Sequence, residues 1–531
     1  MKDNITQPFK WQYYALGLFL VFLFCVQAFY IQSSMILNAD VSFLSQIALY
    51  AEGRDFYLQF YEINPPLIVY IYKFIFFINE SSNINYISAL RLGMICYLFI
   101  CSSIILYNIS HFKYGTLISI TISFCFLFTF PNDFLQREHI ITAAIFTYAS
   151  SAINRILGVE TPRRVKVINS FFIFIAISLK PQYFIVFSFS ELYISYHSKK
   201  INNIYSLEVI LSAILGGLYL FYVHTYHQSY FNLIVPLAST SYSAYFIPSE
   251  DIVILIMVLL LFTFLPIRYL YTTCKGNTYS PIINYTIILY LSSIITFSVG
   301  RTGFSYHLLL GANLSLLFIF LSIYTSTLEV VNKKSYRDLI QLSLSILILL
   351  TLHEKGYYNL IPYGINTSSN SAYDSNNTIF DYRDSKSHDI KDLYFSLNKN
   401  SNKNEKIFAL TTTLYPIHTV VAHNNLEWVN KFPVMWPLPN HLTKINDDSD
   451  GVIYFVKNSI KNDLIENRPN LIIIETSDYL RRYPDNFSFL NFINSDKTIH
   501  TYLKSYKVVD IVSYKDMEFT ILKREESKYD K

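Results

Sequence analysis

The sequence predicts a polytopic α-helical membrane protein with a small α/β domain after its last membrane span. Three observations support this fold class. Hydrophobic residues make up 52% of the 531 residues and charged residues 15%, whereas about 25% charged residues is typical of soluble domains. Apolar runs long enough to cross a bilayer recur through the first two thirds of the chain. From residue 353 onward the sequence becomes polar and short β-rich runs appear.

The apolar runs predict about eleven membrane spans, because roughly 20 apolar residues cross the hydrocarbon core as a helix. The expected spans are 13–32, 86–108, 115–131, 139–154, 168–180, 182–197, 204–225, 251–270, 282–299, 306–326 and 337–352. The stretch "NPPLIVYIYKFIFFIN" is short and contains Lys73. If it crossed the membrane, every later loop would invert and the basic loop "RILGVETPRRVK" would lie outside, so it is not counted as a span. We expect it to lie in the membrane interface, with Lys73 reaching toward water.

Lys and Arg residues predict the orientation, because cytoplasmic loops retain positive charge. With the N-terminus in the cytoplasm, alternate loops collect the basic residues Lys2, Lys10, Lys113, Arg155, Arg163, Arg164, Lys166, Lys199, Lys200, Arg268, Lys275, Lys333, Lys334 and Arg337. The acidic first loop, "PNDFLQREH", "RTGFSYH" and the C-terminal segment then lie outside. The first span lacks a small-residue cleavage site and is expected to remain in the protein. The net charge of +4 is small and dispersed, so no nucleic acid partner is expected.

The predicted domains are a transmembrane module over residues 1–352 and an extracytoplasmic α/β domain over residues 353–531. The stretch "GINTSSNSAYDSNNTIFDYRDSKSHD" is rich in Asn and Ser, as linkers are. Beyond it, "KIFALTTT", "NLIIIET" and "YKVVDIVSY" are typical of short strands. The five cysteines, which are Cys25, Cys96, Cys101, Cys125 and Cys274, offer neither a disulfide framework nor a metal site.

The loop after the first span, "LNADVSFLSQIALYAEGRDFYLQFYEINPP", contains more acidic residues than its local structure requires. Residues 38–42 offer N-cap chemistry for an amphipathic helix that stops at Gly53. In the simplest interpretation Asp40 is a helix cap. Glu62 directly precedes "INPP", whose prolines fix the start of the interfacial helix. This turn is a suitable place to hold a carboxylate at the membrane surface.

The order of these features resembles the GT-C superfamily of membrane glycosyltransferases. Within it, the chain looks like the protein O-mannosyltransferase and lipid A aminoarabinose transferase group (glycosyltransferase family 39-like). The resemblance covers most of residues 10–350 and rests on the Asp-bearing loop, "FYEINPPL", Arg91, "NDFLQREHIITAAIF", "LKPQYF" and "GFSYHLLLG". Leu310 and Gly311 stand where the group's "YHxLP" region has a proline. Lys431 replaces an expected Arg in "TLYPIHTVVAHNNLEWVNKFPVMWPLP".

The resemblance implies an inverting transfer of a sugar from a polyprenyl-phosphate donor to a glycan, lipid or protein acceptor on the outer face of the membrane. It implies Asp40 as the base that takes the acceptor's proton, with Asp133 or Glu138 assisting. The alternative for Glu138 is a structural pair with Arg137. The C-terminal domain is expected to cap the site or to help select the acceptor.

The lipid phosphate needs positive charge close to it. The expected phosphate-binding residues are Arg137, Lys180, Arg301 and His307. Lys180 lies within an apolar stretch, where a cation is costly unless it meets an anion or water. A lone His at the start of a span, such as His307, is also common as a purely structural hydrogen-bonding residue.

The resemblance further implies that Glu62 helps to bind a divalent metal ion. His224 and His227 lie in the outer loop "HTYHQSYFNLIVP", from which a second ligand could come, and His227 is the candidate taken here. Neither histidine lies in a spacing that specifies a metal, and a solvated carboxylate before a turn is an equally simple interpretation of Glu62. No nucleotide or organic cofactor is expected.

Three other classes of function remain open. A transporter or flippase would explain charges near the membrane, but no inverted repeat is visible and the acidic residues gather in outer loops. A polysaccharide polymerase or ligase would use the same lipid carrier but usually has a larger outer loop between its late spans. A non-enzymatic scaffold would need no convergence of Asp40 with Arg137 and Lys180. Low Gly content and abundant Asn, Ile and Lys favour a bacterial inner membrane.

Overall fold

The computed structural model describes residues 11–82, 84–200, 205–333, 336–354, 390–444, 451–477, 480 and 482–525. The chain divides into two compact units. We term the first the helical unit, which comprises Met1–Ser33, Ile84–Leu220 and Ile247–Pro362. We term the second the mixed unit, which comprises Ser34–Asn83, Phe221–Phe246 and Tyr363–Lys531. The mixed unit therefore combines the predicted C-terminal domain with two segments from before residue 352.

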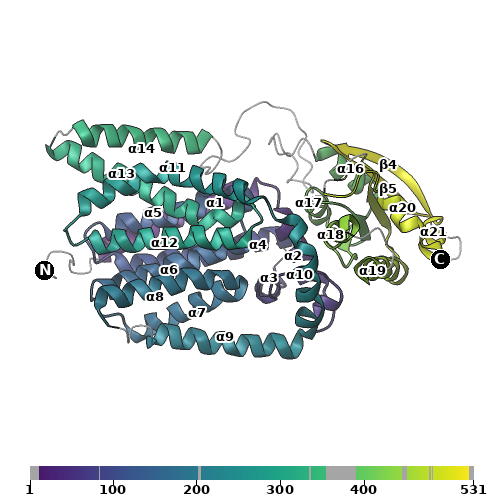
Figure 1. Ribbon diagram of the computed structural model, residues 1–531, viewed down its shortest axis with the longest axis horizontal. Coiled ribbons are helices and arrows are strands. Elements are labelled where there is room, and N and C mark those ends of the chain that lie inside the picture. Colours follow the sequence, from purple (N-terminus) through teal and green to yellow (C-terminus); the bar gives the residue numbers. More distant parts are fainter. Residues whose placement is uncertain are drawn as a thin grey trace. The chain divides into compact units, whose positions relative to one another are not determined.

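The helical unit is built from long helices that lie side by side (Figure 1). Its elements are α1 (Trp11–Ser33), α4 (Tyr86–Ile109), α5 (Gly115–Phe128), η2 (Pro131–Asp133), α6 (Arg137–Ile156), α7 (Arg163–Leu179), η3 (Pro181–Tyr183), α8 (Phe184–Ser198), most of α9 (Leu207–Tyr226), α11 (Ser249–Cys274), α12 (Ser280–Gly300), η7 (Ser305–Leu308), α13 (Leu309–Lys333) and α14 (Tyr336–Glu354). Neighbouring pairs include α1 with α4, α4 with α6, α6 with α7, α8 with α12, and α13 with α14.

Six apolar segments of the described chain are long enough to cross a membrane: α1, α4, α9, α11, α12 and Tyr306–Val331. Each matches one of the expected spans. The other five expected spans also form helices, namely α5, α6, α7, α8 and α14, but these fall outside the set of six. Large apolar side chains remain exposed on the candidate spans, for example Leu261 on α11 at 72%. The fold is therefore that of a membrane protein, while a count of eleven spans is not confirmed.

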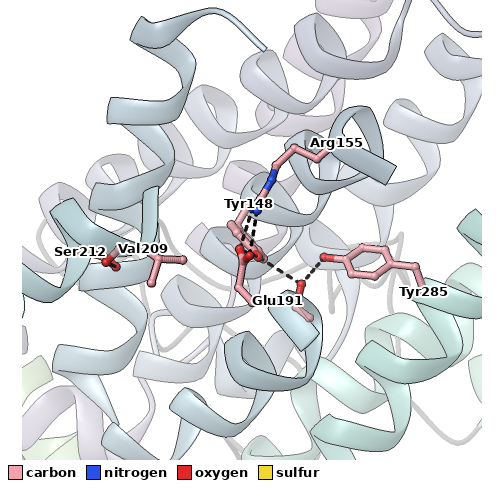
Figure 2. Close-up of polar contacts among 7 residues, drawn as sticks. Tyr148, Arg155, Glu191, Val209, Ser212 and Tyr285 are labelled. Carbon is pink, nitrogen blue, oxygen red and sulfur yellow. Dashed lines mark hydrogen bonds and ion pairs between the residues drawn. The ribbon is translucent and has the colours of Figure 1, made fainter. Parts of the chain in front are cut away.

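A buried polar cluster ties three helices of the helical unit together (Figure 2). Arg155 on α6 donates two hydrogen bonds to Glu191 on α8, with N–O distances of 2.7 and 2.8 Å. Tyr148, also on α6, donates to the same carboxylate at 2.5 Å. Ser190 on α8 extends the cluster to Tyr285 on α12, with an O–O distance of 2.7 Å. Because the Glu191 carboxylate is paired and hydrogen-bonded, its burial is compensated.

The mixed unit begins with the loop that follows α1. It contains α2 (Ala39–Tyr50), η1 (Phe56–Leu58) and α3 (Leu67–Asn79), and later η5 (Tyr230–Ile234), α10 (Val235–Ser241) and η6 (Tyr242–Tyr245). The 13 residues of α3 are fewer than a membrane span needs, in agreement with the expectation that this stretch does not cross. Helix α2 packs against both α3 and α17.

The C-terminal domain of the mixed unit surrounds a five-stranded sheet with strand order β2-β1-β3-β5-β4. Its elements are α16 (Lys391–Asn400), β1 (Lys406–Leu410), α17 (Ile417–His423), β2 (Glu427–Trp428), α18 (Leu438–Lys444), α19 (Gly451–Asn467), β3 (Leu471–Glu475), α20 (Phe489–Asn494), α21 (Lys497–Leu503), β4 (Tyr506–Tyr514) and β5 (Met517–Arg524). Strands β1, β2 and β3 are parallel, whereas β5 pairs antiparallel with β3 and β4.

The three predicted strand runs form β1, β3 and β4, so the prediction of a small α/β domain is confirmed. Central strands in such a sheet are buried on both faces, and all five residues of β3 are buried. Strands β2 and β5 were not predicted. The expected linker, residues 364–389, lies outside the described residues.

Candidate functional site

The helical unit brings three of the sequence-predicted site residues into one buried cluster. Lys180 forms an ion pair with Glu138. The Lys180 Nζ also lies 2.8 Å from His307 Nε2, and His307 Nε2 lies 3.4 Å from Glu138 Oε1. Glu138 is fully buried and the Lys180 side chain is 7% exposed. We term these three residues the Lys180 cluster.

The contacts of His307 define its tautomer. The Lys180 ammonium can only donate, so His307 Nε2 accepts a hydrogen bond and carries no proton. The proton then lies on Nδ1, which is 2.8 Å from Thr302 Oγ1 and donates to it. His307 is therefore a neutral imidazole that orients the lysine instead of adding a second charge. Thr302 was not singled out by sequence reasoning, since nothing in "RTGFSYH" marks it as the partner of the histidine.

Local sequence explains how Lys180 reaches this cluster. Pro181 disfavours the helical conformation for the residue before it, and Lys180 is extended at the end of α7, with φ −148° and ψ 105°. The chain then turns through η3 into α8. The break places Lys180 at a helix junction, where its side chain meets Glu138 in the first turn of α6. A carboxylate in that position is also favoured by the helix dipole.

The loop that precedes α6 has an unusual backbone. Phe130 and Leu135 adopt left-handed conformations, with φ values of 49° and 73°, which are costly for residues other than glycine. On the other side of the cluster, Gly303 has φ +65°, and an added Cβ would lie 2.5 Å from Ile247. A side chain at position 303 would therefore face both a strained backbone conformation and the Ile247 side chain. The turns that lead into α6 and η7, on either side of the Lys180 cluster, are thus conformationally constrained.

A small recess adjoins the Lys180 cluster. It is lined by Gln182, Tyr183, Thr296, Phe297, Gly300 and His307. Glu138 Oε2 is buried and makes no hydrogen bond within the described residues. An unsatisfied buried carboxylate oxygen is costly, and it offers an acceptor to a hydroxyl or amine of a bound molecule. His307 belongs to both the recess and the Lys180 cluster, so the two adjoin at this histidine.

Lys180, one of the expected phosphate-binding residues, has Glu138 as an acidic partner in this structure. Arg137 is buried, and its positive charge also acts on Glu138. Arg301 is exposed at the end of α12, where its carbonyl oxygen accepts a hydrogen bond from the amide of Ile247 at 3.0 Å. Asp133 is half-buried, and its carbonyl oxygen accepts from His139 Nδ1 at 2.9 Å.

Asp40 belongs to the mixed unit and lies in the first turn of α2. The interpretation of Asp40 as the helix cap is wrong, because Asn38 is the N-cap residue. Asn38 Oδ1 accepts a hydrogen bond from the Asp40 amide at 2.9 Å. The Asp40 carboxylate is therefore not needed to cap the helix, and the residue is half-buried. Helix α2 ends at Tyr50, three residues before the expected stop at Gly53.

The contacts of Glu62 and His227 do not fit a metal site. Glu62 Oε1 accepts hydrogen bonds from the backbone amide and the side-chain amide of Asn64, at 2.8 and 2.5 Å. His227 lies between Tyr70, whose hydroxyl is 2.5 Å from Nε2, and Asp55, whose carboxylate is 3.6 Å from Nδ1. Burial lowers the pKa of His227, although the Asp55 carboxylate opposes this shift. No group of three or more metal-ligating side chains exists among the residues that the structure describes.

Comparison with solved structures identifies a protein of the same fold. The structure of ArnT from Cupriavidus metallidurans, bound to undecaprenyl phosphate, matches with a TM-score of 0.53 and 10% sequence identity. The match covers 95% of this chain and 97% of that chain. No family model and no curated protein sequence matches this chain. At this level of identity the likeness shows that the two chains share a fold, and nothing beyond the fold.

Proposed function

We propose that the protein is an inverting glycosyltransferase that moves a sugar from a polyprenyl-phosphate donor to an acceptor at the outer face of a bacterial inner membrane. The proposal rests on the shared fold together with the side-chain chemistry of the Lys180 cluster. The sugar is a hexose or a pentose, and the acceptor offers a hydroxyl or a similar nucleophile. In this orientation the N-terminus is cytoplasmic and the C-terminal domain lies in the periplasm.

The Lys180 cluster is the observation that carries the proposal. A buried lysine is costly among apolar helices unless it meets an anion, and Lys180 is held in place by both Glu138 and His307. An ammonium group with three donors suits a phosphate monoester or diester. The matching structure of the same fold holds undecaprenyl phosphate. A polyprenyl-phosphate group is therefore the ligand that we assign to this cluster.

The proposed reaction uses Asp40 as its base. The Asp40 carboxylate takes the proton of the acceptor hydroxyl, and the acceptor oxygen forms a bond to the anomeric carbon. The bond between that carbon and the phosphate oxygen breaks, and polyprenyl phosphate leaves with the electron pair. Lys180 stabilises the negative charge of the leaving group. Proton removal by a positioned base contributes roughly 10²–10⁴-fold in rate.

The test is a transfer assay with the purified full-length protein in detergent, a panel of polyprenyl-phosphate hexoses and pentoses as donors, and glycan, lipid and protein acceptors. The Asp40→Asn variant keeps the size and the position of the side chain but cannot accept the proton. We expect wild-type protein to release polyprenyl phosphate and the variant to turn over about 10²–10⁴-fold more slowly. Asp392→Asn is the matched control, because Asp392 lies in the first turn of α16 and is exposed.

Two outcomes would contradict the proposal. Normal turnover by a folded Asp40→Asn protein would remove Asp40 as the base. Movement of the intact lipid-linked sugar across a vesicle membrane, without cleavage of the sugar–phosphate bond, would instead identify a flippase.

A further inference from the structure

We infer that the C-terminal domain positions the loop after α1, which carries the proposed base Asp40. Two residues of α17, Thr419 and His423, form hydrogen bonds to the backbone of Leu37, three residues before Asp40. Thr419 and His423 are then positioning residues for the transfer reaction. This inference rests on the proposed function, because it concerns the placement of the proposed base. It assigns the C-terminal domain a role different from capping the site or selecting the acceptor.

Both polar backbone groups of Leu37 are bonded to one side of α17. The Leu37 amide donates to His423 Nε2 at 3.0 Å, and Thr419 Oγ1 donates to the Leu37 carbonyl oxygen at 3.0 Å. Thr419 and His423 are four residues apart, so they share a helix face. Leu37, Thr419 and His423 are all buried. Water therefore cannot easily replace either hydrogen bond, and the backbone at Leu37 is held from two directions.

The hydrogen bonds of the next residues carry this constraint to Asp40. Asn38 directly follows Leu37 and caps α2 by accepting the amide of Asp40 at 2.9 Å. The Asn38 carbonyl oxygen accepts both the amide and the hydroxyl of Ser42, each at 2.8 Å. The first turn of α2 is thus rigidly connected to Leu37. A shift of Leu37 away from α17 would move the Asp40 backbone with it.

Further along α2, two more contacts prevent the helix from rotating. The ring of Phe43 lies 5.1 Å from the ring of His418, which in turn lies 4.1 Å from the ring of Trp428. The Trp428 amide donates to Gln46 Oε1 at 3.2 Å. Phe43 and Gln46 are separated by one helical turn, so this face of α2 is fixed against the C-terminal domain. We term these contacts and those of Leu37 the loop–domain contact.

The C-terminal domain also holds the second half of the same loop. Lys431 donates through Nζ to the carbonyl oxygen of Leu58, and its own carbonyl oxygen accepts the amide of Tyr61 at 2.7 Å. The Lys431 amide in turn donates to Asp463 at 2.7 Å. The residues just before Glu62 are therefore attached to the same domain. The loop that carries Asp40 and Glu62 is fixed at two separate places.

The test compares Thr419→Val with Thr419→Ser in the full-length protein. Valine has nearly the shape of threonine but cannot donate to Leu37, whereas serine can. Because a catalytic group displaced by about 1 Å can cost on the order of 100-fold in rate, we expect Thr419→Val to lower kcat roughly 10- to 100-fold. The KM for the polyprenyl-phosphate donor should stay the same, and Thr419→Ser should restore most of the kcat.

A second measurement follows the contact itself. Hydrogen–deuterium exchange of the peptide that spans residues 34–43 should become roughly five- to tenfold faster in Thr419→Val, which corresponds to the loss of one ordinary hydrogen bond. Thr501→Val is the matched control, because the Thr501 hydroxyl donates within α21, to the Lys497 carbonyl oxygen at 2.8 Å, and the side chain is exposed. This variant should leave both readouts unchanged.

The possible results separate the inference from the function on which it rests. Unchanged exchange in Thr419→Val overturns the positioning role, whatever the activity. Faster exchange with an unchanged kcat shows that the contact does not matter for catalysis and also overturns it. If the wild-type protein cleaves no polyprenyl-phosphate sugar, the proposed function is contradicted. In that case Asp40 is not a catalytic base, and the inferred positioning role fails for that separate reason.

Discussion

The Lys180 cluster shows how one lysine can be kept charged among apolar helices. Glu138 supplies the opposite charge, and His307 accepts a hydrogen bond from the ammonium group while it remains neutral. Removal of either charge alone would leave the other buried and unpaired, at a cost of about 3–5 kcal/mol. Replacing both at once avoids this penalty. A double substitution is therefore the appropriate way to test ligand binding at this cluster.

Asp463 provides a pH-dependent contribution to the stability of the C-terminal domain. Burial raises the pKa of its carboxyl group from 3.8 to about 7, although hydrogen bonding from the Lys431 amide opposes the shift. Between these two pKa values the folded protein holds a proton that the unfolded chain has released. Stability therefore falls as the pH rises through this window.

We predict that Asp463→Asn reduces this pH dependence and raises the melting temperature more at about pH 8 than at about pH 5. The asparagine oxygen can still accept from the Lys431 amide but does not ionise. Tryptophan fluorescence during heating measures the effect, because Trp428 and Trp436 belong to the C-terminal domain and Trp11 is the third tryptophan of the chain. Asp392→Asn is the control, and an equal shift of the melting temperature at both pH values would contradict the prediction.

Among the helices, the cluster of Arg155, Glu191 and Tyr148 joins α6 to α8 (Figure 2). Its members are not equivalent. Among the described residues, Arg155 is the positively charged partner in the ion pair of Glu191. Tyr148 adds a hydrogen bond to a carboxylate that Arg155 already satisfies. Removal of the Arg155 side chain should therefore lower the free energy of unfolding clearly more than removal of the Tyr148 hydroxyl.

We predict that Arg155→Met destabilises the helical unit by about 3–5 kcal/mol, because it leaves a buried carboxylate unpaired. Tyr148→Phe should cost about 1 kcal/mol, which is typical for one hydrogen bond. Heating in the presence of a thiol-reactive dye measures both effects, since all five cysteines lie in the helical unit and three of them, Cys25, Cys101 and Cys125, are buried. Arg163→Met, at an exposed arginine of α7, should change little. Equal effects of the two cluster variants would show that the charge pair is not the main contribution.

The helices and strands that could be predicted from the sequence are those that local residue patterns determine. Long apolar runs predicted the six candidate spans, and the separate expected spans 168–180 and 182–197 agree with the break between α7 and α8 beside Lys180. Strands β1 and β3 could be predicted because they are short, β-rich and flanked by polar residues. Strand β2 has two residues, too few to produce a pattern, so it could not be recognised.

Across the whole molecule, the contacts that define the sites join residues far apart in the sequence. Lys180 and Glu138 are 42 positions apart, and Leu37 and His423 are 386 positions apart. A single sequence contains no signal for such pairs, so Glu138 appeared equally suited to pair with Arg137. The same limit explains why Thr302, Thr419 and His423 were not predicted. The association of the loop after α1 with the C-terminal domain likewise depends on tertiary packing alone.

The assignment of the Lys180 cluster to a polyprenyl phosphate is the central claim, and equilibrium binding of radiolabelled undecaprenyl phosphate to the full-length protein tests it most directly. The compared proteins are wild type, the charge-balanced double variant Lys180→Met/Glu138→Gln, and Lys275→Met as a control at an exposed lysine. We predict saturable binding by wild type and Lys275→Met. The double variant should bind roughly 10- to 100-fold more weakly, as expected for the loss of a hydrogen bond to a charged group. Equal affinity of the folded double variant, or no saturable binding by the wild-type protein, would contradict the account.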